Sequence, residues 1–258
     1  MLAIIPLHAE GARYSADLVF LPGLWAAPAV WRPAASYLAH RGWEGRIVGF
    51  GEVAGGLEAR GAAVAAHLRQ RSRPAVLVAH DAGAAVALHA ASLRPVAAVV
   101  LVAPLDPTSP AVRTITRRWD VVAALLLGRA LPPPAGAAAV RCYGSLPPEV
   151  ASGLVPERAD AVLDVVRGRV ELARPGVPAA LVSTEQDPLV PDPAGLACRL
   201  GADHLVLRSH GHWPLGGPGW RPAAAVLHRW LVRRLGEELL ELHAEAMAER
   251  DADDDPSA

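Results

Sequence analysis

The strongest constraint on the fold is an alternation of short apolar segments with helical stretches along most of the chain. The apolar segments have no polar face, as expected of strands in a parallel sheet that helices cover on both sides. The predicted strands are residues 18–21, 46–50, 75–78, 97–102, 179–183 and 204–207, and the predicted helices are residues 31–40, 56–71, 84–93 and 222–235. The sequence therefore predicts an α/β fold, and 258 residues suffice for one large domain.

The alternation fails after the fourth predicted strand, where prolines interrupt two helical segments at about residues 111–129 and 149–170. Helices inserted after a core strand would lie over the crevice where such sheets bind ligands. We therefore expect a core of residues 1–104 and 176–235, a helical lid of residues 105–175, and a charged C-terminal helix with a disordered acidic tail over residues 236–258.

The composition excludes several classes of function. All 25 basic residues are Arg, so no lysine is available for a Schiff base or for binding a phosphate. A net charge of −1 with 2 Phe and 3 Tyr offers nucleic acid neither a basic field nor many stacking surfaces. Cys142 and Cys198 lack metal-binding spacing, the amino terminus lacks a basic leader, and no apolar run is long enough for a membrane span. We expect a cytoplasmic protein, with no cofactor, metal, membrane or nucleic-acid partner, that acts on a small molecule and could form a homodimer.

The most informative segment is Val76-Leu-Val-Ala-His-Asp-Ala-Gly-Ala-Ala-Val86, an apolar strand that continues through Asp81 into a helix of small residues. This is the context of the G-x-S-x-G nucleophile elbow, a strained strand-to-helix turn that lifts one side chain above the sheet. Ala79, Asp81 and Gly83 occupy the positions of the first glycine, the nucleophile and the second glycine. A carboxylate therefore replaces the serine. The competing interpretation is that Asp81 only caps the helix that begins at Ala82.

With this segment the sequence resembles the α/β-hydrolase superfamily over roughly residues 17–235, and an elbow aspartate is typical of its haloalkane dehalogenases and epoxide hydrolases. Three further segments agree in order. Residues 21–33 resemble the oxyanion loop of small esterases and hydroxynitrile lyases, with Pro22 at the usual His. Residues 181–191 resemble the strand-then-aspartate segment, and residues 209–214 resemble the terminal histidine loop.

The resemblance implies an α/β-hydrolase fold, with a mostly parallel sheet, flanking helices and a short helical lid. It assigns Asp81, Asp187 and His212 as nucleophile, acid and base, in the chain order expected of this fold. It further implies an oxyanion hole formed by the backbone N–H groups of Leu24 and Ala82, and a substrate pocket lined by Trp25, Trp119, Tyr143 and Trp213. Each assignment has a simpler alternative, because Asp187 could be a turn residue and His212 a surface loop residue. Asp106 is the next candidate for the acid, and a His210-x-His212 metal pair has no accompanying carboxylate motif.

Three functional interpretations remain open. In the first, Asp81 attacks an electrophilic carbon at an epoxide, carbon–halogen, lactone or ester bond, and water activated by His212 hydrolyses the resulting ester. In the second, Asp81 or His212 is a general base in a lyase, decarboxylase or other non-hydrolytic member of the superfamily. In the third, the chain is an inactive binding protein. Ala82 stands where haloalkane dehalogenases have Trp, and an apolar lid helix favours a small, mainly apolar substrate.

Overall fold

The computed structural model describes residues 1–112, 123–124, 126–208 and 211–253, with residues 237–253 described as backbone only. Within these residues, seven strands form one sheet in the order β1-β3-β2-β4-β5-β6-β7. β1 is antiparallel to β3, and the other neighbouring strands are parallel. The strands are β1 (Ala3–Leu7), β2 (Asp17–Leu21), β3 (Gly45–Gly49), β4 (Ala75–Asp81), β5 (Ala98–Pro104), β6 (Ala179–Thr184) and β7 (Asp203–Leu207).

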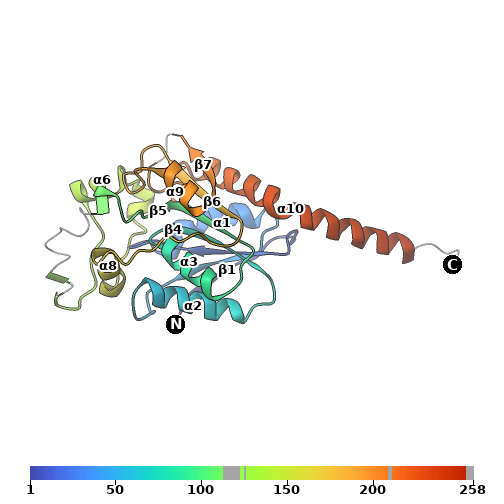
Figure 1. The fold of residues 1–258 in the computed structure, drawn as a ribbon, viewed down its shortest axis with the longest axis horizontal. Coiled ribbons are helices and arrows are strands. Elements are labelled where there is room, and N and C mark those ends of the chain that lie inside the picture. Colours follow the sequence, from blue (N-terminus) through green and yellow to red (C-terminus); the bar gives the residue numbers. More distant parts are fainter. Residues whose placement is uncertain (113–122, 125, 209–210, 254–258) are drawn as a thin grey trace.

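Helices cover both faces of this sheet, as the mainly apolar character of its central strands requires. The helices are the 3-10 helix η1 (Pro28–Trp31), α1 (Arg32–Ala39), α2 (Leu57–Arg69), α3 (Gly83–Leu93), α6 (Gly136–Tyr143), α7 (Pro148–Ala151), α8 (Ala159–Val166), α9 (Pro193–Leu200) and α10 (Trp220–Asp253). The apolar faces of α2, α3 and α9 join one core cluster, and those of α1 and α10 join the other. Figure 1 shows α10 projecting from one end of the molecule and α6 and α8 at the opposite end.

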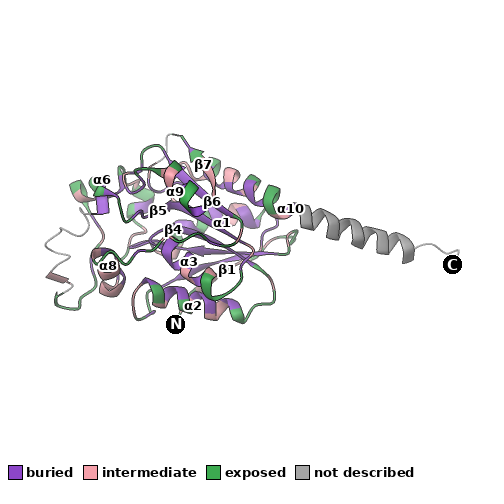
Figure 2. Cartoon of the chain, viewed as in Figure 1, coloured by how far each residue is buried: buried purple, intermediate pink, exposed green. Residues whose placement is uncertain are grey.

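Strand β4 shows how the sequence divides between the two cores. Leu77 and Ala79 pack in the cluster with α2 and α3, whereas Val76 and Val78 pack in the cluster with α1 and α10. Successive side chains of a strand point to opposite faces, so a strand buried on both sides must be apolar throughout. Every residue of β2, β3, β4, β5 and β6 is buried, as Figure 2 shows. The predicted α/β class with a mostly parallel sheet is confirmed.

The core elements agree with the predicted ranges within a few residues, but β1, η1, α6 and α9 were not predicted. β1 is a half-exposed edge strand, and Pro6 within it has no N–H to donate. α6 and α9 are short helices of eight residues each. Elements this short carry too few periodic positions to be recognised beside prolines and glycines.

The inserted segment between β5 and β6 differs from the prediction. The single helix predicted over residues 149–170 is wrong, because α7 and α8 are separate. Between them the chain is extended, and Leu154 and Glu157 form isolated β-bridges with Ala26 and Leu131. Pro156 explains this break, since proline removes an N–H and disfavours helical backbone at the residue before it. Most of the helix predicted over residues 111–129 lies outside the described residues.

The C-terminal helix predicted from residue 236 is the continuation of α10, which extends to Asp253. The first residues of the acidic segment are therefore helical, and residues 254–258 lie outside the described part of the chain. Among the described residues, no helix combines the length and apolar character needed to cross a membrane.

Candidate active site

Asp81 stands on a strained turn between β4 and α3. It is the last residue of β4, its φ is +52°, and the register with β5 shifts between His80 and Asp81. α3 begins two residues later, and its N-terminus has no side-chain cap, so the capping interpretation of Asp81 is wrong. Gly83 is required sterically, because a Cβ there would stand 2.6 Å from the carbonyl oxygen of Pro22. Left-handed backbone at a non-glycine residue is costly and is concentrated at functional sites.

The loop after β2 brings a backbone donor directly to this carboxylate. The N–H of Leu24 donates to Asp81 Oδ2 over 2.9 Å, and the N–H of Ala82 also hydrogen-bonds to the carboxylate. The approach depends on Gly23, where a Cβ would lie 2.4 Å from the Cβ of Asp81. The two amides predicted as an oxyanion hole thus both act on the carboxylate of Asp81 itself.

His212 lies on the other side of the Asp81 carboxylate, backed by Asp187. Its Nδ1 is 3.0 Å from Asp187 Oδ2, and its Nε2 is 3.9 Å from Asp81 Oδ1. Because a carboxylate only accepts hydrogen bonds, Nδ1 carries a proton, and neutral His212 presents an unprotonated Nε2 toward Asp81. The side chains of both His212 and Asp187 are fully buried, so His212 is not a surface loop residue.

Asp187 also has the turn contact that its simpler interpretation predicts, since its Oδ1 accepts the N–H of Leu189 over 2.9 Å. The two roles are therefore compatible. Asp106 is engaged elsewhere, because its Oδ1 accepts from the N–H and hydroxyl of Thr108 and its Oδ2 faces Arg199 at 3.7 Å. The geometry favours Asp187 over Asp106 as the partner of His212.

Burial controls the electrostatics of the three side chains. Desolvation raises the pKa of Asp81 from 3.8 to about 6, against the opposing effect of His212 and the amides of Leu24 and Ala82. Burial disfavours the His212 imidazolium, but the carboxylates of Asp187 and Asp81 outweigh it and raise the pKa of His212 above 6.5. Above these values, an ionised Asp81 stands beside a neutral His212. A nucleophile and a general base need these protonation states.

Two atoms of this group have no hydrogen-bond partner among the described residues. These are Asp81 Oδ1 and His212 Nε2, the pair that face each other at 3.9 Å. Buried polar atoms are usually satisfied, and exceptions require an explanation such as a catalytic role. The unpartnered atoms are the ones that a nucleophile and a base would use.

Aromatic side chains surround the imidazole. Tyr143, from the inserted segment, stacks on His212 with ring centroids 5.2 Å apart and an interplanar angle of 16°. Trp213 meets the rings of both His212 and Tyr143 edge-on. Trp25 is buried, and its indole N–H donates to the carbonyl of Leu131. Two further residues singled out from the sequence, Trp119 and His210, lie outside the described residues.

Sequence reasoning missed His80, the neighbour of Asp81 in the elbow. Its Nε2 is 2.7 Å from the carbonyl oxygen of His212, which can only accept, so Nε2 donates. Burial and the nearby His212 hold the pKa of His80 well below 6.5, which keeps its ring neutral. His80 therefore ties the histidine loop to the elbow. His80 lies next to Asp81 in the elbow segment, and this position was the sequence signal that could have identified it.

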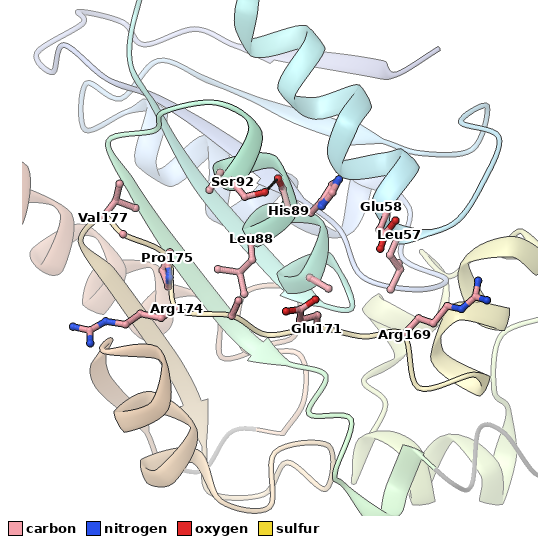
Figure 3. Close-up of a pocket in the computed structure, with 14 residues that line it drawn as sticks. Leu57, Glu58, Leu88, His89, Ser92, Arg169, Glu171, Arg174, Pro175 and Val177 are labelled. Atoms are coloured by element: carbon pink, nitrogen blue, oxygen red, sulfur yellow. Dashed lines mark hydrogen bonds between the residues drawn. The ribbon is translucent and has the colours of Figure 1, made fainter.

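The site is enclosed. Asp81 is 2% exposed and His212 is 0% exposed. A cavity of about 360 Å³ lies elsewhere, between α2, α3 and residues 169–177, and the described residues that line it include none of the three candidate catalytic side chains. Figure 3 shows Arg169 and Arg174 at opposite ends of that cavity, pointing in opposite directions. Within the described ranges, no three His, Cys, Asp or Glu side chains form a group suited to a metal ion.

A parallel sheet with an elbow after β4, an aspartate after β6 and a histidine after β7 defines the α/β-hydrolase class of proteins. The Alpha/beta hydrolase family matches residues 18–236, and the chain belongs to that family. The resemblance inferred from the sequence motifs is thereby confirmed at the level of family and fold.

Solved structures share this fold across nearly their whole length. A monoacylglycerol lipase from Paleococcus ferrophilus is 17% identical, with 91% of this chain and 99% of that chain covered and a TM-score of 0.67. A lipase-esterase related protein from Clostridium acetobutylicum is 13% identical, covering 89% and 99%, with a TM-score of 0.68. MenH from S. aureus is 13% identical, covering 90% and 98%, with a TM-score of 0.66. No curated protein matches the sequence. At these identities the likeness concerns the fold, on which many different chemistries occur.

Proposed function

We propose that this protein is a hydrolase in which Asp81 is a covalent nucleophile, His212 the base that activates water, and Asp187 the acid that orients His212. The substrate is a small, mainly apolar molecule with an electrophilic carbon. A strained three-membered ether or a carbon–halogen bond is the simplest such group.

One observation carries the proposal: the two oxygens of Asp81 have different surroundings. Oδ2 accepts the Leu24 N–H over 2.9 Å, whereas Oδ1 has no hydrogen-bond partner among the described residues. An oxygen freed from hydrogen bonds and desolvated is the better nucleophile, and the oxygen held by amides is where negative charge can be stabilised. In this arrangement Oδ1 is free to attack, and Oδ2 is held where negative charge can be stabilised.

The reaction follows from these positions. Asp81 Oδ1 bonds to the substrate carbon, and the electron pair of the broken bond leaves with the halide or with the epoxide oxygen. The epoxide oxygen takes a proton from water, and the proton balance is restored when Asp81, left as the carboxylic acid after ester hydrolysis, ionises again. His212 Nε2 then removes a proton from water, and the hydroxide bonds to the Asp81 carboxyl carbon. The negative charge that develops on Oδ2 is stabilised by the amides of Leu24 and Ala82. Cleavage of the carboxyl carbon–Oδ1 bond releases an alcohol, which takes the proton from His212.

A general-base role for Asp81 is less compatible with the same contacts. In that route the Leu24 and Ala82 amides would have to stabilise an oxygen of the substrate, yet both hydrogen-bond to the carboxylate of Asp81. The covalent route needs no such exchange, because the charged oxygen of the intermediate is Oδ2 itself.

The inserted segment of residues 105–175 serves as the cover of this site in the proposal. Tyr143 stacks on His212, and Leu131 accepts a hydrogen bond from Trp25. Aromatic and aliphatic surroundings favour a neutral, apolar substrate, since a second buried charge would require a partner of its own.

The experiment is to trap the ester. His212→Ala protein is incubated separately with an epoxide, a haloalkane, a lactone and an ester, and each sample is analysed by intact-protein mass spectrometry. One of these probes should add a stable mass that maps to the peptide containing Asp81. The double variant Asp81→Asn/His212→Ala is the matched control and should gain none.

A single wild-type turnover in ¹⁸O-labelled water separates nucleophile from base. Water attacks the carboxyl carbon in the covalent route, so the label should enter the Asp81 peptide and the first product should be unlabelled. Labelled product with an unlabelled Asp81 peptide would overturn the covalent mechanism and support the general-base alternative.

A further inference from the structure

A buried ion pair joins α2 to the inserted segment beside the candidate active site. Arg60 of α2 and Glu157 of the inserted segment are 2% and 8% exposed, respectively. Arg60 Nη2 is 2.5 Å from Glu157 Oε1, and Nη1 is 3.4 Å from Oε2. The guanidinium also lies over the ring of Phe50, 5.1 Å from its centroid. The pair joins two segments that are 97 residues apart in the sequence.

Glu157 uses its second oxygen to bind the oxyanion loop. Oε2 accepts the N–H of Trp25 over 3.2 Å. Trp25 directly follows Leu24, whose N–H is bound to Asp81 Oδ2, and its φ is +61°. A bulky aromatic residue adopts left-handed backbone only where its surroundings impose it. The carboxylate of Glu157 therefore acts one peptide group away from the donor that contacts the nucleophile.

The backbone around Glu157 reinforces this attachment. The carbonyl of Trp25 accepts the N–H of Val155 over 2.8 Å, and the indole of Trp25 donates to Leu131. Leu131 in turn exchanges two backbone hydrogen bonds with Glu157, at 2.7 and 2.8 Å. The turn at Trp25 is thus held through its N–H, its C=O and its side chain by one small part of the inserted segment.

Stability alone does not account for an ion pair at this place. Desolvation of two charges offsets most of their attraction, and well-packed apolar side chains often stabilise a fold equally well. Arg60 Nε also lacks a hydrogen-bond partner among the described residues. An apolar replacement, however, could not accept the N–H of Trp25. Beyond packing, Glu157 therefore contributes a directional hydrogen bond to the N–H of Trp25.

We infer that Glu157, oriented by Arg60, is a positioning residue that fixes the turn at Trp25 and thereby aims the Leu24 N–H at Asp81 Oδ2. Its effect on reaction rate rests on the proposed function. Its effect on the loop does not, and can be measured without a substrate.

The main test uses the double variant Arg60→Met/Glu157→Leu, which removes both charges together and leaves neither one buried alone. Glu157→Gln keeps an acceptor oxygen for Trp25, and Asp160→Asn alters a nearby carboxylate that binds Gly55 and Arg158. Thermal melting establishes that each variant is folded. Amide hydrogen exchange of Leu24 and Trp25 should be roughly tenfold faster in the double variant, as expected for loss of one charge-assisted hydrogen bond. Asp160→Asn should exchange like the wild type, and Glu157→Gln should lie between.

The reaction gives a second, independent measurement in the His212→Ala background. Below the pH midpoint of this step, ester formation on Asp81 should be slower in the double variant, because loss of the Leu24 hydrogen bond leaves a smaller fraction of the carboxylate ionised. The pH midpoint of ester formation should move upward, because the Leu24 hydrogen bond lowers the pKa of Asp81. A change confined to stability would leave this midpoint unmoved.

The possible results separate the two proposals. A folded double variant with wild-type exchange at Leu24 and Trp25 overturns the positioning role. An unchanged rate and pH midpoint of ester formation overturn it equally. Faster exchange in a protein whose His212→Ala form traps no ester supports the positioning role and counts against the proposed hydrolase mechanism.

Discussion

Replacing Asp81 with Asn should stabilise the protein at alkaline pH while abolishing any reaction that uses the carboxylate. Burial raises the pKa of Asp81 to about 6 from 3.8, so the folded protein resists ionising this group. The difference corresponds to about 3 kcal/mol lost from the free energy of unfolding once Asp81 is ionised in both states, at about 1.4 kcal/mol per tenfold change in proton affinity. Asn keeps an oxygen to accept the Leu24 N–H and has no charge to desolvate.

The sign of this effect depends on pH. An acid whose pKa is raised by folding does not reduce the free energy of unfolding at pH values below its pKa in the unfolded state, because both states then hold the proton. The cost grows as pH rises from 3.8 to about 6 and is constant above that range. The stability advantage of Asp81→Asn should therefore be about 3 kcal/mol at pH 8 and about 1.5 kcal/mol at pH 5.

Thermal unfolding by circular dichroism or calorimetry measures this difference. For a domain of this size, the variant should melt about 6 to 12 °C above the wild type at pH 8 and about half as far above it at pH 5. Asp160→Asn is the control, because the pKa of Asp160 is shifted in the opposite direction. The hydrogen bond from Arg158 lowers this pKa, so removing the Asp160 charge should not stabilise the fold. The reasoning would be refuted if Asp81→Asn melted at or below the wild-type temperature at pH 8. It would also be refuted if the difference in melting temperature from the wild type were the same at both pH values.

Three further predictions concern the same site. Asp187→Asn should leave the protein folded but lower turnover by about 10³-fold or more, because His212 would lose the acceptor that fixes its tautomer; near-normal turnover would transfer the role to Asp106. The rate of ester formation should rise with pH through about 6, and the rate of ester hydrolysis should rise through a value above 6.5, since ionised Asp81 and neutral His212 are the active forms. Stopped-flow or quenched single turnovers separate the two steps. If either rate fell with pH over this range, the assignment would be contradicted. Gly83→Ala should destabilise the fold by about 1–3 kcal/mol or more, because its Cβ would lie 2.6 Å from the Pro22 oxygen, whereas Gly176→Ala, with no atom within 4 Å, should be neutral in the same melting assay.

The parts of the structure that sequence predicted are those with a local signal. The buried strands are mostly apolar, and the Asp81, Asp187 and His212 segments each carry a short motif at the carboxyl end of a strand. α9 lacked a periodic signal and was not predicted, although its start is marked by Asp192, which accepts the N–H of Gly195 as an N-cap directly before Pro193. β1 had only a weak signal, since it is a short apolar run that contains a proline and lies half-exposed at the edge of the sheet.

The parts that could not be predicted depend on contacts between distant segments. Glu157 lies 132 residues from Trp25 in the sequence, in an insertion with no regular period, and neither residue indicates the other. The pKa of Asp81 is likewise a property of the folded site, because it depends on burial of the carboxylate and on the opposing effects of His212 and the amides of Leu24 and Ala82. Sequence motifs identified which side chains come together, but not how completely the fold removes them from water.

The two amides that converge on Asp81 have a consequence for how such a fold changes its chemistry. They hydrogen-bond to the carboxylate that lies between the loop after β2 and the start of α3. With an aspartate, that oxygen belongs to the protein, and the electrophile can be a saturated carbon. A serine at this position has no second oxygen, so the same amides would be free to polarise the carbonyl of a bound acyl compound. Under the proposed mechanism, a substitution of residue 81 by serine would therefore exchange alkyl transfer for acyl transfer within the same fold.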